Sequence, residues 1–302
     1  MLRPKPLKIG DTVGLIGTSS PTDSDRIEPS IKALENLGLK VILGESCYAS
    51  HGYLSGKDEL RAKDINEMFR NPDIKGVFCI RGGYGAARLL DLIDFEIIKA
   101  NPKVFVGYSD VTALHIAINQ MCNLITFHGP MPSTELCKGI DNYTMEYYLM
   151  NIFEGKPLGF IQAPGTMKIR TLVSGYCEGI LTGGNLSLVA SSIGTKYEID
   201  TRGKVLFLEE VDEEPYRVDR MILQLKQSGK LDSAAGIILG YFTNCIAEEP
   251  ERSLSLREVF EELIVPLKKP TIYNFPCGHT LPTVTLPLGA KVIISGNSVF
   301  VR

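Results

Sequence analysis

Residues 104–118, VFVGYSDVTALHIAI, carry the pattern from which the fold class of this chain is predicted. The first three are an apolar run that reads as a short buried strand, and after the tight turn G-Y-S-D the apolar residues recur at helical spacing. A strand that turns directly into a helix predicts one βα unit of a parallel sheet. Ser109 stands at the corner. It either caps the helix or is a nucleophile projected by the turn.

Strand and helix signals alternate in this way through the first half of the chain. Continuous apolar runs end in turns at residues 17–20, 81–85 and 107–110. This pattern predicts a parallel sheet covered on both faces. A Gly- and Pro-rich stretch then interrupts the alternation. We therefore expect an N-terminal α/β domain over residues 1–155, a linker over 156–174, and a smaller mixed α/β domain over 175–302.

Composition excludes several classes of function. The 302 residues are 44% hydrophobic with a net charge of −3 and no basic block, which argues against nucleic acid or an anionic membrane as the main partner. No secretory signal and no apolar run of about 20 residues is found, so we expect a cytoplasmic protein. Seven scattered cysteines indicate small core residues in a reducing compartment. No metal-ligand spacing and no G-x-G-x-x-G occur, so neither a metal nor a cofactor is predicted.

The three turns supply the candidates for chemistry. In parallel sheets, active residues lie at the carboxyl ends of strands. The glycines of turn 81–85 let backbone N–H groups approach an anion. The match of Ser109 to a nucleophile elbow is imperfect, because G-x-S-x-G would require glycine where this chain has Val111. Helix capping therefore stays the competing interpretation for Ser109 or Asp110.

A serine nucleophile needs a base and an acid to orient it. Of four histidines, His279 lies in a glycine-flanked loop that is free to orient its ring, and the others are His51, His115 and His128. Glu209 and Glu210 end an apolar strand. Because side chains alternate across a strand, only one of the two can face a site. A solvated acidic cluster is the alternative for this stretch.

Five segments together resemble a known family, the LD-carboxypeptidases. They are RGGYGAARLL, VFVGYSDVTALH, GGNLSL, LFLEEVDEEPYRVDRMILQL and GHT…TLPLGAKV, in this order, and the resemblance spans Lys8 to about Val292. It implies an N-terminal flavodoxin-like parallel-sheet domain, a C-terminal swivelling-type mixed α/β domain and a homodimer.

The resemblance also implies a catalytic triad across the two domains. The serine of G-Y-S-D falls on Ser109, the acid on Glu209 and the histidine of the late Gly-His motif on His279. The family commonly has Asp after the triad acid, where this chain has Glu210. We keep Glu209, because strand alternation lets only one of the two acids face His279.

The family's oxyanion hole maps onto backbone N–H groups. These are the amides of Gly83 and Asp110. Beside the first of them, Arg81 either binds a terminal carboxylate of the substrate or forms a structural ion pair.

The implied function is that of a serine-type LD-carboxypeptidase. It would cleave the bond between the L-centre of a diamino acid and the terminal D-alanine of cytoplasmic murein tetrapeptides through an acyl-enzyme, in cell-wall recycling. One alternative is an immunity-type peptidase that cleaves peptidyl-adenylate antibiotics. The absence of tryptophan and the compact length rank it second. A non-catalytic module that binds a small ligand is the other.

Overall fold

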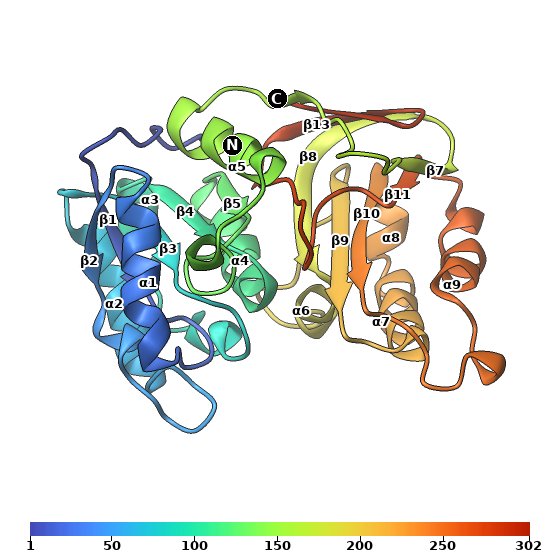
Figure 1. Ribbon diagram of the computed structural model, residues 1–302. Helices are drawn as coiled ribbons and strands as arrows, with labels where there is room; N and C mark the ends of the chain where they lie inside the picture. Colours follow the sequence, from blue (N-terminus) through green and yellow to red (C-terminus); the bar gives the residue numbers. More distant parts are fainter. The chain divides into compact units, whose positions relative to one another are not determined.

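The computed structural model describes residues 1–302, which form two compact units (Figure 1). Unit 1 comprises Met1–Lys156 and Thr285–Gly289, and unit 2 comprises Pro157–Val284 and Ala290–Arg302. The stretch 157–174, expected as part of a linker, belongs to unit 2 and supplies two strands of its sheet. The return of Thr285–Gly289 to unit 1 is not in the predicted boundaries.

Unit 1 is built on a six-stranded sheet. Its strands are β1 (Thr12–Ile16), β2 (Lys40–Leu43), β3 (Ile74–Cys79), β4 (Val104–Gly107), β5 (Thr126–His128) and β12 (Leu286–Leu288). Its helices are α1 (Ser24–Glu35), α2 (Asp58–Arg70), α3 (Phe95–Ala100), α4 (Thr112–Cys122) and α5 (Asn142–Leu149). Short 3₁₀ turns span Glu45–Cys47, Ala86–Leu89, Ser109–Val111 and Leu136–Lys138, and Met150–Glu154 is π-helical.

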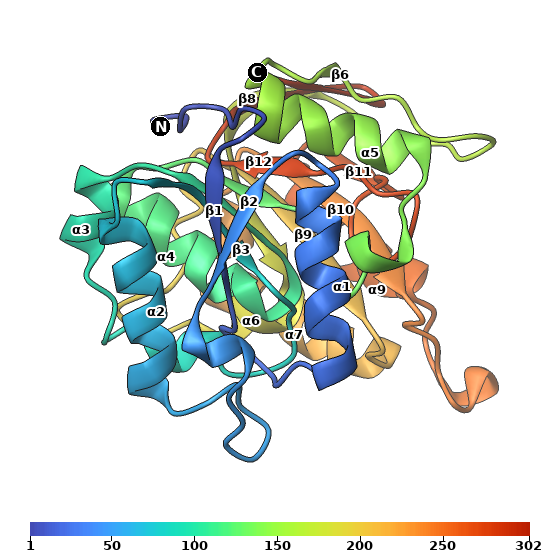
Figure 2. The same cartoon turned by 60° about the vertical axis from the view of Figure 1, so that its left-hand side comes forward.

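The strand order in this sheet is β12-β5-β4-β3-β1-β2. All neighbours are parallel except β12, which runs antiparallel to β5. Without β12 this is the doubly wound order of flavodoxin, as expected. Helices α2, α3 and α4 pack in series, and α1 covers the opposite face (Figure 2). The order of strands reverses between β1 and β3, and ligands bind at the carboxyl ends of strands at such a point.

Unit 2 is built on an eight-stranded mixed sheet. Its strands are β6 (Gly159–Phe160), β7 (Arg170–Val173), β8 (Tyr176–Asn185), β9 (Val205–Val211), β10 (Gly236–Thr243), β11 (Thr271–Tyr273), β13 (Lys291–Ser295) and β14 (Ser298–Val301). Its helices are α6 (Leu186–Ser191), α7 (Pro215–Gln227), α8 (Lys230–Ser233) and α9 (Leu256–Leu263), with 3₁₀ turns at Pro250–Arg252 and Val265–Leu267.

The centre of this second sheet is parallel and its flanks are antiparallel. Strands β8 to β11 run parallel in the order β8-β9-β10-β11, whereas β7, β13, β14 and β6 pair antiparallel outside them. Helices α6, α7 and α9 pack in series beside it. The mixed α/β architecture expected for the second half of the chain is confirmed.

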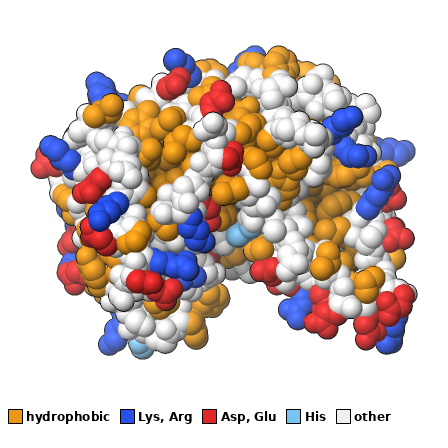
Figure 3. Space-filling view, in the orientation of Figure 1, with side chains coloured by type: hydrophobic (Ala, Val, Ile, Leu, Met, Phe, Trp, Pro, Cys, Tyr) orange, Lys and Arg blue, Asp and Glu red, His pale blue; other side chains and the backbone are white.

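The surface carries charges of both signs. Figure 3 shows acidic and basic side chains interspersed over the visible face. None of the helices combines the length and the apolar composition that crossing a membrane requires.

Candidate active site

Ser109 directly follows β4 and has a left-handed backbone, with φ +63°. This conformation costs a residue that has a Cβ roughly 1–2 kcal/mol. Tyr108 before it is fully extended, with φ −159° and ψ −169°, so the chain turns sharply at the serine. No side chain caps the first turn of α4. Ser109 is therefore not a capping residue, and its strained backbone is of the kind that accumulates at active sites.

The glycine turn after β3 lies against this serine. A Cβ built on Gly82 would fall 2.9 Å from the Cβ of Ser109 and 3.1 Å from its Oγ. Gly83 has φ +124°, and a Cβ there would collide with the side chain of Ser20. Glycine at 82 lets the backbone of the turn approach Ser109 this closely, and glycine at 83 leaves room for Ser20.

The carboxylate of Asp110 ties the glycine turn to the corner that holds the serine. It accepts a hydrogen bond of 2.8 Å from the backbone N–H of Ala86, and the residue is 2% exposed. Burial raises the pKa of Asp110, while hydrogen bonds from Ser19 and from the amides of Ala86 and Gly85 oppose the rise. The turns after β1, β3 and β4 thus meet around one carboxylate.

Arg61, on α2, is a positioning residue that the sequence analysis missed. Its side chain is fully buried and donates to the carbonyls of Thr18 and Gly85, and it is paired with Asp58. It therefore links the turn after β1 to the turn after β3. The signal in the sequence was its place on the stripe 61, 65, 69 of an otherwise apolar helix face.

Arg81 bonds to backbone carbonyls. Its guanidinium donates to Gly82 O at 3.2 Å and to Pro21 O at 3.0 Å. These bonds hold Arg81 beside the glycine turn. Its five N–H donors exceed the two that these carbonyls require.

His115 supports the serine corner from behind. Its Nε2–H donates to Gly107 O at 2.8 Å, and its Nδ1 accepts from the hydroxyl of Thr126 at 2.8 Å. Burial lowers the pKa of His115 to about 4, so the ring is neutral at physiological pH. His115 is buried within α4, His128 is buried on β5, and His51 is exposed in a hairpin.

In unit 2, the structure joins His279 to Glu209. The Nδ1–H of the imidazole donates to Glu209 Oε2 at 2.7 Å, and Glu209 is fully buried at the end of β9. Burial raises the pKa of Glu209, and the charge and hydrogen bond of His279 act against this rise. In this tautomer Nε2 carries the lone pair, so the ring is oriented as a general base.

Glu210 points to the other face of β9. It accepts from Asn185 Nδ2 at 2.7 Å and from the amide and hydroxyl of Ser187 at 2.8 and 2.7 Å. It therefore fastens β9 to the start of α6. Both acids are buried, so the alternative of a solvated acidic cluster is wrong for these two residues.

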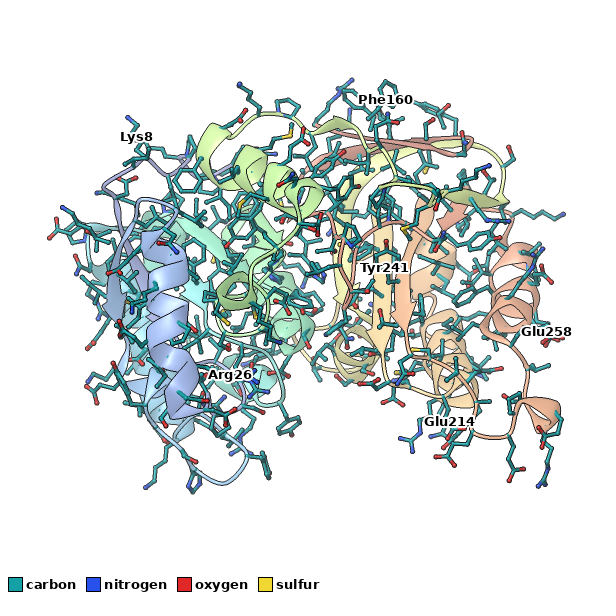
Figure 4. All side chains as sticks on the ribbon, in the orientation of Figure 1. Lys8, Arg26, Phe160, Glu214, Tyr241 and Glu258 are labelled. Carbon is teal, nitrogen blue, oxygen red and sulfur yellow. The ribbon has the colours of Figure 1, made fainter.

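An irregularity in β10 shapes the surroundings of the pair. The β9–β10 register shifts between Leu239 and Phe242, and the amide of Tyr241 donates to Cys277 O at 2.8 Å. This bond continues the pairing of β10 past the end of β11 and fixes Cys277, two residues before His279, against β10. The Tyr241 side chain, labelled in Figure 4, donates its hydroxyl to Met167 Sδ at 2.8 Å. Such bulges are common beside active sites.

A strained serine between strand and helix in one unit, and a histidine hydrogen-bonded to a buried glutamate in the other, are the residue types that α/β serine hydrolases combine. The sequence comparisons agree. Residues 13–129 match the LD-carboxypeptidase N-terminal domain and residues 178–294 match its C-terminal domain. The chain belongs to the LD-carboxypeptidase family, and it is a serine carboxypeptidase.

Individual relatives cover nearly the whole chain. The probable murein peptide carboxypeptidase of Bacillus subtilis (strain 168) is 45% identical over 296 residues, which cover 97% of this chain and 91% of that protein. The microcin C7 self-immunity protein MccF of Escherichia coli is 30% identical over 319 residues, covering 96% and 92%.

Solved structures also match over nearly the whole chain. A wild-type apo structure of the microcin C7 self-immunity protein MccF matches with a TM-score of 0.90 at 28% identity, covering 100% of this chain and 98% of that one. The muramoyltetrapeptide carboxypeptidase from Oxalobacter formigenes matches with a TM-score of 0.81 at 28% identity, covering 96% and 97%.

Proposed function

We propose that this enzyme hydrolyses murein tetrapeptides at the bond between the L-centre of a diamino acid and the terminal D-alanine, in cell-wall recycling. The observation that carries the proposal is the hydrogen bond of 2.7 Å between His279 and the buried Glu209, which gives a carboxypeptidase of this family an oriented base. The similarity to a relative named as a murein peptide carboxypeptidase supports the substrate class.

In the proposed mechanism, Ser109 is the nucleophile. His279 accepts the hydroxyl proton as Oγ attacks the scissile carbonyl, and then donates it to the amine of the leaving D-alanine. An acyl-enzyme remains on Ser109. Water, deprotonated by His279, hydrolyses this ester. Glu209 holds the imidazole in the required tautomer and stabilises the imidazolium.

We assign the oxyanion hole to the backbone N–H groups of Gly83 and Asp110. Gly83 lies in the turn that packs against Ser109, and the carboxylate of Asp110 fixes the far end of the same turn through Ala86. Loss of one donor of this kind costs about 10²–10³ in rate. Arg81, held beside the turn, is the candidate for binding the terminal carboxylate of the substrate.

The proposal extends to location and assembly. All seven cysteines are free and six are buried, which supports a reducing compartment such as the cytoplasm. We expect a homodimer in solution, and light scattering coupled to size-exclusion chromatography measures it.

A second candidate is an immunity-type peptidase that cleaves peptidyl-adenylates. The TM-score of 0.90 to a structure of MccF favours it. The chain contains no tryptophan to stack on a nucleobase, which favours the murein substrate.

The deciding experiment measures D-alanine released from a muramoyl tetrapeptide by the wild type and by Ser109→Ala. Release by the wild type alone supports the proposed activity and nucleophile. A folded wild type that releases no D-alanine but cleaves a peptidyl-adenylate would establish the second candidate. Binding of the peptide without cleavage of either substrate would indicate a binding protein.

A further inference from the structure

Two tyrosines form an exposed aromatic corner beside the glycine turn of unit 1. Tyr53 is 64% exposed and Tyr84 is 56% exposed, and their rings meet edge to face with centroids 5.5 Å apart and planes at 72°. Exposed aromatic clusters that no neighbouring element covers mark binding surfaces more often than single exposed residues do. The mechanism proposed above uses neither ring.

The corner is a built feature of the fold. Tyr53 stands in a tight hairpin closed by reciprocal backbone hydrogen bonds of 2.8 and 3.1 Å between His51 and Leu54. Leu54 is buried, and its side chain occupies the space that a Cβ on Gly85 would need. The amide of Tyr84 donates to Ser20 Oγ at 3.1 Å. Hairpin and glycine turn are therefore packed together.

The corner also lies within reach of the proposed nucleophile. Gly82 contacts Ser109, and Tyr84 follows two residues later, at most about 7 Å along the chain. A substrate chain extends by at most about 3.6 Å per residue, so a group three residues from the scissile carbonyl lies up to about 11 Å away. The ring of Tyr84 extends beyond its own Cα, so it can contact a substrate group at about this distance from the scissile carbonyl.

Charge and geometry restrict what the corner can bind. Arg88 lies near both rings, but its guanidinium is paired with both oxygens of Asp58 at 2.7–3.0 Å, so its charge is largely neutralised. This disfavours a carboxylate as the group recognised here. Because the planes are inclined by 72°, the two rings cannot hold a flat nucleobase between them. They present one apolar ring face bordered by phenol hydroxyls.

We propose that Tyr53 and Tyr84 form a subsite for the pyranose ring of a muramoyl peptide, whose C–H face packs on an aromatic ring while its hydroxyls bond at the rim. The inference rests on the proposed function and adds to it the recognition of a sugar-bearing substrate. The corner makes the enzyme prefer a tetrapeptide that carries its sugar to the free tetrapeptide.

The test compares kcat/KM for a muramoyl tetrapeptide and for the same tetrapeptide without sugar. The wild type is expected to prefer the sugar-bearing peptide. In Tyr84→Ala and Tyr53→Ala the ratio of the two kcat/KM values falls up to about tenfold, the size of one aromatic contact. Tyr84→Phe keeps the ring and loses only one rim hydroxyl, so the ratio should fall less than in Tyr84→Ala. Tyr176→Ala is the matched control, because Tyr176 lies in β8 of unit 2 and is also 64% exposed.

Three results would overturn the inference. They are a wild-type ratio of one, an unchanged ratio in both alanine variants, and a loss in Tyr84→Phe as large as in Tyr84→Ala. Calorimetric titration of Ser109→Ala protein with both peptides separates this failure from failure of the proposed function. If the wild type cleaves neither peptide, equal affinity for the two still refutes the sugar subsite. Tighter binding of adenosine monophosphate that is lost in Tyr84→Ala would reassign the corner to a nucleobase.

Discussion

Replacing Ser109 by glycine is expected to give a more stable protein than replacing it by alanine, while both variants lose activity. At φ +63° a side chain with a Cβ is strained by about 1–2 kcal/mol, and glycine is not. Relief of this strain favours the glycine variant. The benefit is reduced by about 0.4–1 kcal/mol, because glycine leaves the unfolded chain more flexible than alanine does. Ser109→Gly should therefore exceed Ser109→Ala in free energy of unfolding by about 1 kcal/mol. Both lack the hydroxyl, so kcat should fall by roughly 10⁶ in each.

Differential scanning calorimetry and urea denaturation measure this difference. In a unit of this size, about 1 kcal/mol corresponds to a rise of about 2–4 °C in Tm for the glycine variant over the alanine variant. The matched control is Lys32→Gly against Lys32→Ala, on an exposed position in α1. There glycine should be the less stable, by about 1 kcal/mol. If Ser109→Gly is no more stable than Ser109→Ala while the control behaves as expected, the inference that the backbone at position 109 is strained is wrong.

Three further predictions concern the surroundings of the proposed catalytic groups. Gly82→Ala places a methyl group 2.9 Å from the Cβ of Ser109, so the serine must move, and a displacement of about 1 Å lowers kcat about 10²-fold; a wild-type kcat would contradict the packing described. His115→Gln removes a ring whose pKa is lowered from 6.5 to about 4, so the wild type loses up to about 3 kcal/mol of stability as the pH falls through this window and the variant does not. Urea denaturation at pH 7 and 4 measures the difference, and equal losses in both proteins would refute it. Glu209→Gln keeps the shape but cannot stabilise a charged His279, so kcat should fall about 10⁴-fold with the fold intact; a loss below tenfold in steady-state assays would exclude the proposed role.

The parts of the fold that could be predicted are those encoded locally. Apolar runs followed by Gly- and Ser-containing turns located the carboxyl ends of β1, β3 and β4, because the strand period and the turn chemistry act over a few residues. Alternation along β9 predicted that Glu209 and Glu210 point to opposite faces, and their contacts with His279 and Ser187 agree.

The rest depends on contacts between distant residues. No local pattern shows that Ser109 has a positive φ, and the glycine turn that packs against it comes from a different strand, far earlier in the sequence. Gly183 and Gly184 lie near the end of β8, and Gly183 makes room there for the carbonyl of Phe207 on β9, a contact that only the folded sheet reveals. Bridging roles such as that of Arg61 are likewise set by tertiary packing.

Strand β12 belongs to unit 1, although the residues on both sides of it belong to unit 2, and this limits how the chain can be divided into fragments. Three chain crossings, after Lys156, Val284 and Gly289, connect the two units, so no single boundary separates them. A fragment ending at Lys156 would lack β12 and expose the backbone edge of β5, where Leu286 pairs with His128 in the intact protein. A fragment starting at Pro157 would carry that strand without its partner. The first half should therefore regain a covered β5 edge only when residues 285–289 are supplied, either by the second half or grafted onto its own chain.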